Sequence, residues 1–239
     1  MKAPFKFKRF EVAQDRCAMK IGTDAVLLGA WAPLDHSPES ILDIGAGTGV
    51  IALQMAQRSS AQTIDAVEID TDAFEQCTDN FEQSPWADRL YCYHAAIQEY
   101  ASEIDEQYDL IVSNPPFFSD EFKSGDAQRD TARFNDALPF DHLAICAAHL
   151  LANNGVFALI LPLKEEAQFL KLAATAGLFL KRRCGVYGNT QNQETEKRVL
   201  LALTKIEQKI EHQKLTIETA RHEYTPEYIA IVQDFYLKM

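Results

Sequence analysis

The chain has 239 residues, of which 47% are hydrophobic and 24% are charged, ordinary values for a folded globular protein that exclude intrinsic disorder. Its formal net charge of −12 argues against nonspecific binding of nucleic acid through overall charge. Neither a membrane span nor a secretory signal is visible, and the scattered cysteines and histidines show no disulfide or metal-ligand spacing, so we expect a cytoplasmic protein without a metal ion.

Residues 5–31 show no clean hydrophobic period, and their first part predicts a short hairpin or an irregular lead. A helix is expected to follow, capped near Thr23 or Asp24, because both residue types are good N-caps. A lead of this kind could lie across the mouth of a site.

A glycine-rich turn is predicted after the strand at residues 40–44, where the sequence continues Gly-Ala-Gly-Thr-Gly. Glycines at alternate positions let the backbone turn sharply and approach a ligand that a Cβ would repel. Helical spacing then runs from Val50 to Arg58, and the free N–H groups at its start favour negative charge.

The next strand, residues 63–69, ends in the acidic residues Glu68 and Asp70. Glu68 follows Gly49 at about the 20-residue spacing at which an acidic residue binds ribose hydroxyls in nucleotide-binding folds. The glycine turn and this acid together indicate a nucleotide site.

Helices and strands continue to alternate, which predicts an α/β fold with a mostly parallel sheet and helices on both faces. The expected helices are 71–83, capped by Thr71 or Asp72, then 97–104, 138–153 and 164–176, and the expected strands are 89–94, 109–113 and 156–161. The helix at 138–153 should end at Asn153-Asn154-Gly155, which resembles a helix C-terminus. Strands 178–186 and 198–204 predict an antiparallel pair at the sheet edge, and a helix from about 226 to 237 should pack one apolar face on the core.

The stretch 109–118, Asp-Leu-Ile-Val-Ser-Asn-Pro-Pro-Phe-Phe, predicts a buried strand that stops at a rigid bend, where open α/β sheets bind ligands. The side-chain carbonyl of Asn114 and a backbone carbonyl freed by the prolines could accept both hydrogens of a planar amino group. Phe117 could stack on the ring that carries it. These contacts would favour the pyramidal nitrogen of a transition state. A plain turn with an aromatic plug stays open as the alternative.

Residues 120–135 are polar and charged, and Arg129 and Arg133 would share a helical face. A substrate-contacting loop and a plain connector both remain open for this segment.

These motifs, in this order, resemble those of the class I methyltransferases that use S-adenosylmethionine. Asp43-Ile-Gly-Ala-Gly-Thr-Gly49 is similar to their first motif, Glu68 to their ribose-binding acid, and Asn114-Pro-Pro-Phe117 to their amino-group methylation signature. Residues 15–24, 29–33, 83–87 and 235–237 further resemble the bacterial valine-tRNA adenine-37 N6-methyltransferases, and the resemblance spans essentially the whole chain.

The resemblance implies a Rossmann-like fold with a seven-stranded sheet, S-adenosylmethionine as cofactor, and N6-methylation of an adenine in tRNA, beside the anticodon. The implied cofactor-binding residues are Asp43, Gly45, Gly47, Gly49, Glu68, Ile69 and Asn114, and the implied catalytic residues are Asn114, Pro115, Pro116 and Phe117. The candidate substrate-binding residues are Lys20, Thr23, Asp24, Arg129 and Arg133. We expect one domain over residues 1–239, with a lead (1–35), a core (36–205) and a packed extension (206–239).

One departure and two alternatives remain. Ala96 stands where such enzymes often carry an acid that binds the cofactor's adenine, so either a backbone carbonyl or Gln98 substitutes, or the affinity for the cofactor is reduced. A protein glutamine N5-methyltransferase would use the same signature on another planar nitrogen, although we expect such an enzyme to carry a helical domain ahead of the glycine strand. A noncatalytic RNA-binding protein that kept the fold is the second alternative.

Overall fold

Continuous apolar runs form the centre of the sheet, because a parallel strand covered on both faces needs one. These runs are β3 (Ser40–Ile44), β6 (Tyr108–Ser113) and β7 (Leu151–Pro162). The computed structural model describes residues 3–116, 138–189 and 195–239. The other strands in these ranges are β1 (Phe5–Lys6), β2 (Glu11–Val12), β4 (Thr63–Glu68), β5 (Leu90–His94), β8 (Phe179–Asn189), β9 (Glu196–Thr204), β10 (Glu211–Ala220) and β11 (Glu223–Tyr224).

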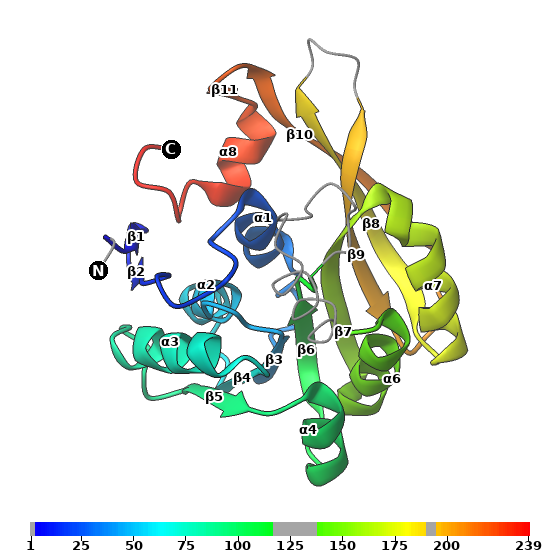
Figure 1. Cartoon of the computed structure of the whole chain (residues 1–239). Coiled ribbons are helices and arrows are strands. Elements are labelled where there is room, and N and C mark those ends of the chain that lie inside the picture. Colours follow the sequence, from blue (N-terminus) through cyan, green and yellow to red (C-terminus); the bar gives the residue numbers. More distant parts are fainter. Residues whose placement is uncertain (1–2, 117–137, 190–194) are drawn as a thin grey trace, which may run out of the picture.

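Helices cover both faces of this sheet (Figure 1). One face carries α1 (Thr23–Trp31), α2 (Val50–Arg58), α3 (Thr71–Glu82) and α8 (Pro226–Val232), and the other carries α4 (Ile97–Glu103), α6 (Phe140–Leu150) and α7 (Glu166–Thr175), which follows the short 3-10 helix η2 (Leu163–Glu165). None of the helices in the described ranges is both long and apolar enough to cross a membrane.

The main sheet has nine strands over the described ranges, in the order β11-β10-β8-β9-β7-β6-β3-β4-β5, while β1 and β2 form a separate hairpin. Among these described strands, β9 and β11 run antiparallel to their neighbours and the other pairings are parallel. The predicted α/β fold with a mostly parallel sheet is therefore confirmed, and so is the antiparallel pairing of β8 with β9.

The predicted position of that pair at the sheet edge, and the count of seven strands, are wrong. β10 pairs in parallel with β8 and β11 follows it, so two further strands lie outside the pair. Leu215 is the one buried residue of β10, and the other residues of this strand are exposed or half-buried. Such a strand has no apolar run to mark it in the sequence.

The helix predicted at 138–153 is also shorter than expected. α6 ends at Leu150, and Asn153, Asn154 and Gly155 lie in β7, where the pairing with β6 shifts register. A Cβ on Gly155 would lie 2.9 Å from the carbonyl oxygen of Tyr108, so this glycine serves the close approach of two strands. It does not have the left-handed backbone of a helix C-cap.

Three smaller corrections concern helix ends. The N-cap of α1 is Gly22 instead of Thr23 or Asp24, and the N-cap of α3 is Asp70, whose side chain accepts the N–H of Ala73 at 2.8 Å. α8 ends at Val232 instead of continuing to 237.

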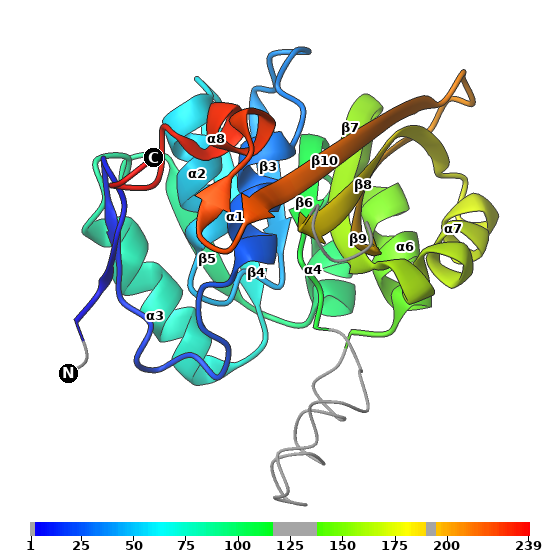
Figure 2. The ribbon, with the colours of Figure 1, turned by 90° about the horizontal axis from the view of Figure 1, so that it is seen from above.

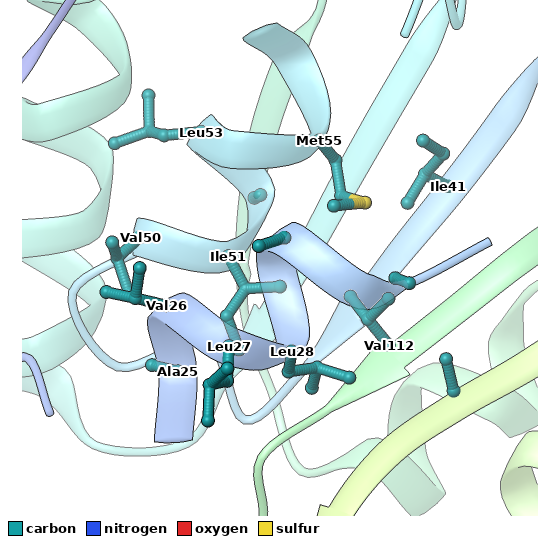
Figure 3. Packing of buried hydrophobic residues seen from close by; sticks show 14 of the residues in the cluster. Ala25, Val26, Leu27, Leu28, Ile41, Val50, Ile51, Leu53, Met55 and Val112 are labelled. Atoms are coloured by element: carbon teal, nitrogen blue, oxygen red, sulfur yellow. The ribbon is translucent and has the colours of Figure 1, made fainter. Parts of the chain in front are cut away.

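The contact between α1 and α2 depends on a glycine. Figure 3 shows Leu27 and Leu28 of α1 in one buried cluster with Ile51 of α2 and Val112 of β6. A Cβ on Gly29 would lie 2.2 Å from Oε1 of Gln54, a fully buried side chain whose amide nitrogen donates to the carbonyl of Val26 at 3.1 Å.

We therefore expect Gly29→Ala to lower the free energy of unfolding by about 1 to 3 kcal/mol, because the added methyl must displace a buried, hydrogen-bonded side chain. Urea denaturation measures this. Gly188→Ala is the control, since a Cβ there meets no atom within 4 Å. Equal stability of the two variants would contradict the packing described.

Candidate active site

The register of the central strands places the predicted motifs side by side. Ile44 pairs with Val67 of β4 on one side and with Ser113 of β6 on the other. The hydroxyl of Ser113 also donates to the carbonyl of Ile44 at 2.9 Å. The glycine turn after β3 therefore lies between Glu68 and Asn114 at the carboxyl edge of the sheet, where α/β folds bind ligands.

The glycine turn has the conformation that its sequence predicts. Gly45, Gly47 and Gly49 have φ values of 73°, 55° and 76°, in the left-handed region that favours glycine. A Cβ on Gly49 would lie 2.6 Å from the ring of Phe81, whereas a Cβ on Gly45 or Gly47 would meet nothing within 4 Å. Gly49 is thus needed for packing, while Gly45 and Gly47 border open space of the kind that a bound cofactor would fill.

Glu68 fixes this turn from the end of β4. Its Oε2 accepts the N–H of Gly47 at 2.7 Å, its Oε1 accepts the N–H of Asp70 at 2.9 Å, and the residue is buried. A carboxylate has about four acceptor positions, so two backbone contacts leave positions for the hydroxyls of a ribose. Ile69, the next residue, is 49% exposed and offers an apolar surface beside them.

Asp43 lies beneath the turn and is fully buried. Its Oδ2 accepts the N–H of Ala52 at 3.1 Å, whereas its Oδ1 has no hydrogen-bond partner in the part of the chain that the structure describes. Burial raises the pKa of the Asp43 carboxyl to about 7, and the nearby Glu68 carboxylate adds to the shift, while the N–H of Ala52 opposes it. The carboxyl is therefore poised to exchange a proton near neutrality.

Asn114 stands at the end of β6 with its amide oxygen buried. Among the residues that the structure describes, this Oδ1 has no hydrogen-bond partner, and the adjacent Pro115 is buried as well. A buried acceptor without a donor costs roughly 1–3 kcal/mol, so the bend is suited to accept a hydrogen from a ligand. Phe117, the third position after Asn114, lies outside the described residues, as do Arg129 and Arg133.

The lead segment is attached to α3 by buried amides that the sequence did not indicate as functional. Asn80 accepts the N–H of Ala13 and donates to the carbonyls of Ala13 and Thr48, each at 2.9 Å. Gln76 accepts the N–H of Arg16 at 3.2 Å. Because Thr48 belongs to the glycine turn, Asn80 ties the lead directly to the candidate cofactor site. The signal that the sequence offered for this role was the polar side chains of Gln76 and Asn80 at helix positions that face the core.

The three described substrate-binding candidates differ in their surroundings. Lys20 and Thr23 are exposed, and Thr23 opens α1. Asp24 forms an ion pair with Arg198, whose Nε donates to Oδ2 of Asp24 at 2.8 Å. The structure thus engages Asp24 in a contact between α1 and β9.

The side-chain amide of Gln98, close in sequence to Ala96, is one of the groups expected to replace the missing acid at the cofactor's adenine. Nε2 of Gln98 lies 2.7 Å from Nδ1 of His142. Across the described ranges, no group of three or more His, Cys, Asp or Glu side chains is arranged to hold a metal ion.

Comparison with known proteins connects this arrangement to methyl transfer. The profile of the Methyltransferase small domain matches residues 21–134. A tRNA1(Val) (adenine(37)-N6)-methyltransferase from Flavobacterium psychrophilum is 55% identical over 98% of this chain and 100% of the relative, and one from Flavobacterium johnsoniae is 54% identical over the same shares. A solved structure from Agrobacterium tumefaciens, titled a predicted O-methyltransferase, has a TM-score of 0.65 at 18% identity and covers 89% of this chain and 96% of its own, which shows the shared fold.

The raised pKa of Asp43 gives a pH dependence with a defined sign. A carboxyl whose pKa rises from 3.8 in the unfolded chain to about 7 in the folded one stabilises the fold at low pH, and this contribution is lost as the pH rises through that window. An asparagine amide cannot ionise, so we expect the free energy of unfolding of Asp43→Asn, relative to the unsubstituted protein, to rise across the window. Urea denaturation at a series of pH values measures the difference, and a pH-independent difference would refute it.

Proposed function

Because the chain belongs to the tRNA1(Val) (adenine(37)-N6)-methyltransferase family, we propose that it methylates the exocyclic nitrogen of adenine 37 in valine tRNA at the sheet edge formed by Asn114 and the glycine turn. S-adenosylmethionine is the cofactor. The relatives match this chain along 98–99% of its length, so the membership extends well beyond the shared methyltransferase core.

The observation that carries the proposal is the buried Oδ1 of Asn114 beside the glycine turn, which finds no hydrogen-bond partner within residues 3–116, 138–189 and 195–239. One hydrogen of the adenine amino group would satisfy this acceptor, and the backbone carbonyl of Pro115 is suited to accept the other. Together they would fix the direction of the amino nitrogen, and fixed direction is a large part of the advantage of an enzyme-bound reaction.

The bound cofactor would supply an electrophilic methyl group on a sulfonium, and the electron pair of the broken carbon–sulfur bond would stay on sulfur, which leaves as a neutral thioether. As the nitrogen forms its bond to carbon, it becomes pyramidal and positive, and its N–H groups become stronger donors. The oxygens of Asn114 and Pro115 then bind these hydrogens more tightly than in the ground state, which lowers the barrier. The product amine reaches neutrality by releasing one proton to water.

The cofactor contacts are proposed from the open space and the acceptors of the turn. Gly45 and Gly47 would line the methionine half, and Asp43 would support this end through its unpartnered oxygen. Glu68 would bind the ribose hydroxyls with its remaining acceptor positions, and Ile69 would cover the adjacent ring.

On the substrate side, we propose that Phe117 stacks on the target base beside Pro116 and that Arg129 and Arg133 contact RNA. Lys20 and Thr23 are exposed in the lead and at the start of α1, as RNA contacts require. Asp24 would act through its ion pair with Arg198.

We further propose that residues 1–239 act as one methyltransferase domain in the cytoplasm. The extension after residue 205 supports this, because β10 and β11 join the main sheet and α8 packs in the same buried cluster as α1 and α2. The five cysteines are unpaired in the described structure, as in a reducing compartment.

The decisive variant is Asn114→Ala. We expect it to lower kcat for methyl transfer to an unmodified valine-tRNA transcript by about 100-fold or more, the order seen when one preorganised hydrogen-bonding partner of a reacting group is lost. The dissociation constant for S-adenosylmethionine should stay within about threefold of the unsubstituted value, because other groups provide most of the cofactor contacts. Nucleoside mass spectrometry with an isotopically labelled methyl group measures the N6-methyladenosine.

Asn154→Ala is the matched control, because Asn154 is exposed in β7 and away from the carboxyl edge. A transcript with guanine at position 37 tests the position of the methyl group. Equal turnover of Asn114→Ala and the unsubstituted protein would refute the role of Asn114. Label in a glutamine-containing peptide, with none in tRNA, would refute the RNA substrate.

A further inference from the structure

A groove of about 990 Å³ lies between the β1–β2 hairpin, α1, α8 and the ends of β8 and β10. Its walls combine rings with basic side chains, among them Phe5, Thr23, Lys197, Tyr224, Tyr236 and Lys238. Figure 2 shows the end of β10 next to α8, which also contacts α1.

The strand directions place this groove on the same edge of the sheet as Asn114. β9 is antiparallel to β7 and to β8, so β8 runs in the direction of β7 and β6, and β10 is parallel to β8. The carboxyl ends of β6, β7, β8 and β10 therefore face the same way. At about 4.8 Å per strand, the four steps from β6 to β10 span roughly 19 Å, the length of about six stacked nucleotides of one strand at roughly 3.4 Å each.

A short series of contacts connects the groove with the carboxyl edge of the central strands. Thr23 lines the groove and is followed by Asp24, whose ion pair with Arg198 connects α1 to β9. Arg198 pairs in the sheet with Pro162, the last residue of β7. A polymer whose reacting unit sits at Asn114 can thus continue along this edge into the groove.

The lining has the chemistry of a surface for single-stranded RNA. Tyr224 is half-buried, and its ring lies 5.3 Å from the ring of Tyr228. The ring of Tyr236 meets Phe5 edge to face at 6.4 Å, so each of these rings is in contact with a neighbouring ring. Aromatic rings accept stacked bases of any sequence.

Cations complete this surface. Lys197 and Lys238 are exposed on the walls of the groove. Among the described residues that line it, Glu218 is the acidic side chain, and Lys6 forms an ion pair with Glu11. A local pair of lysines is notable on a chain with a net charge of −12, because phosphate is the partner that such side chains attract.

We propose that this groove binds the nucleotides of the substrate RNA that adjoin the target adenine, with Tyr224 stacking on a base and Lys197 and Lys238 contacting phosphates. The proposal rests on the proposed function for the identity of the RNA. It adds the surface that distinguishes a whole tRNA from a free nucleotide.

The first test measures binding of a fluorescein-labelled, unmodified valine-tRNA transcript by anisotropy. We expect Lys197→Glu/Lys238→Glu to raise the dissociation constant at least about 10-fold and to flatten its dependence on salt concentration, as the loss of phosphate contacts requires. Affinity for S-adenosylmethionine should not change. Lys171→Glu on α7 is the charge-matched control, since Lys171 is exposed and does not line the groove.

The second test concerns stacking. Tyr224→Phe keeps the ring and should bind the transcript as the unsubstituted protein does, whereas Tyr224→Leu keeps apolar bulk without a ring and should bind about 10-fold more weakly. Thermal unfolding of each variant confirms that the fold is retained. Unchanged affinity for the transcript in both Lys197→Glu/Lys238→Glu and Tyr224→Leu would refute the proposal that the groove binds RNA.

The two proposals can fail separately. If the unsubstituted protein methylates tRNA but the groove variants bind it normally, only the groove proposal is refuted. If the unsubstituted protein binds the transcript through the groove yet forms no N6-methyladenosine, the groove is supported and the proposed function is refuted.

Discussion

The site depends on the alignment of β3 with a neighbour on each side. Ile44 is paired with Val67 and with Ser113, so three chain segments that are far apart in sequence end at one level. The backbone hydrogen bonds of a parallel ladder fix this level, and a slip of one residue would turn every side chain to the opposite face. The acid, the glycine turn and the amide that follow these strands are therefore held in position by the centre of the sheet.

Polar groups at this edge serve the fold and the site together. Glu68 satisfies two backbone N–H groups, yet keeps acceptor positions for a ligand. The hydrogen bonding of Asp43 and Asn114 is incomplete, because each has a buried oxygen that accepts no hydrogen bond from the described residues. Such oxygens lower the stability of the protein without ligand, and they raise its affinity for a ligand that donates the missing hydrogen bond. The stability lost in the absence of ligand is recovered as affinity, a balance found at many functional sites.

The sequence was sufficient for the central strands and the motifs at their ends, because apolar runs, glycine spacing and prolines are local signals. Prediction from the sequence failed where the same local pattern fits two different structures, or where no local pattern marks the element. Gly155 has the local context of a helix end, but its role is set by Tyr108, which is distant in sequence. β10 shows no apolar run, and its place follows from pairing with β8. The role of Asn80 needed the lead to be positioned over α3, which no periodicity reveals.

One contact in the structure joins residues separated by almost the whole chain. Phe7 bridges to Tyr236, and the N–H of Lys8 donates to the carbonyl of Phe235 at 2.8 Å. Chains fold progressively as they leave the ribosome, and closing so long a loop carries an entropic cost that local contacts avoid. The contacts of Phe7 and Lys8 with residues 235 and 236 therefore form only after translation has delivered those residues. During synthesis, the central strands and the contacts between Ala13 and Asn80 can form before this long-range link closes.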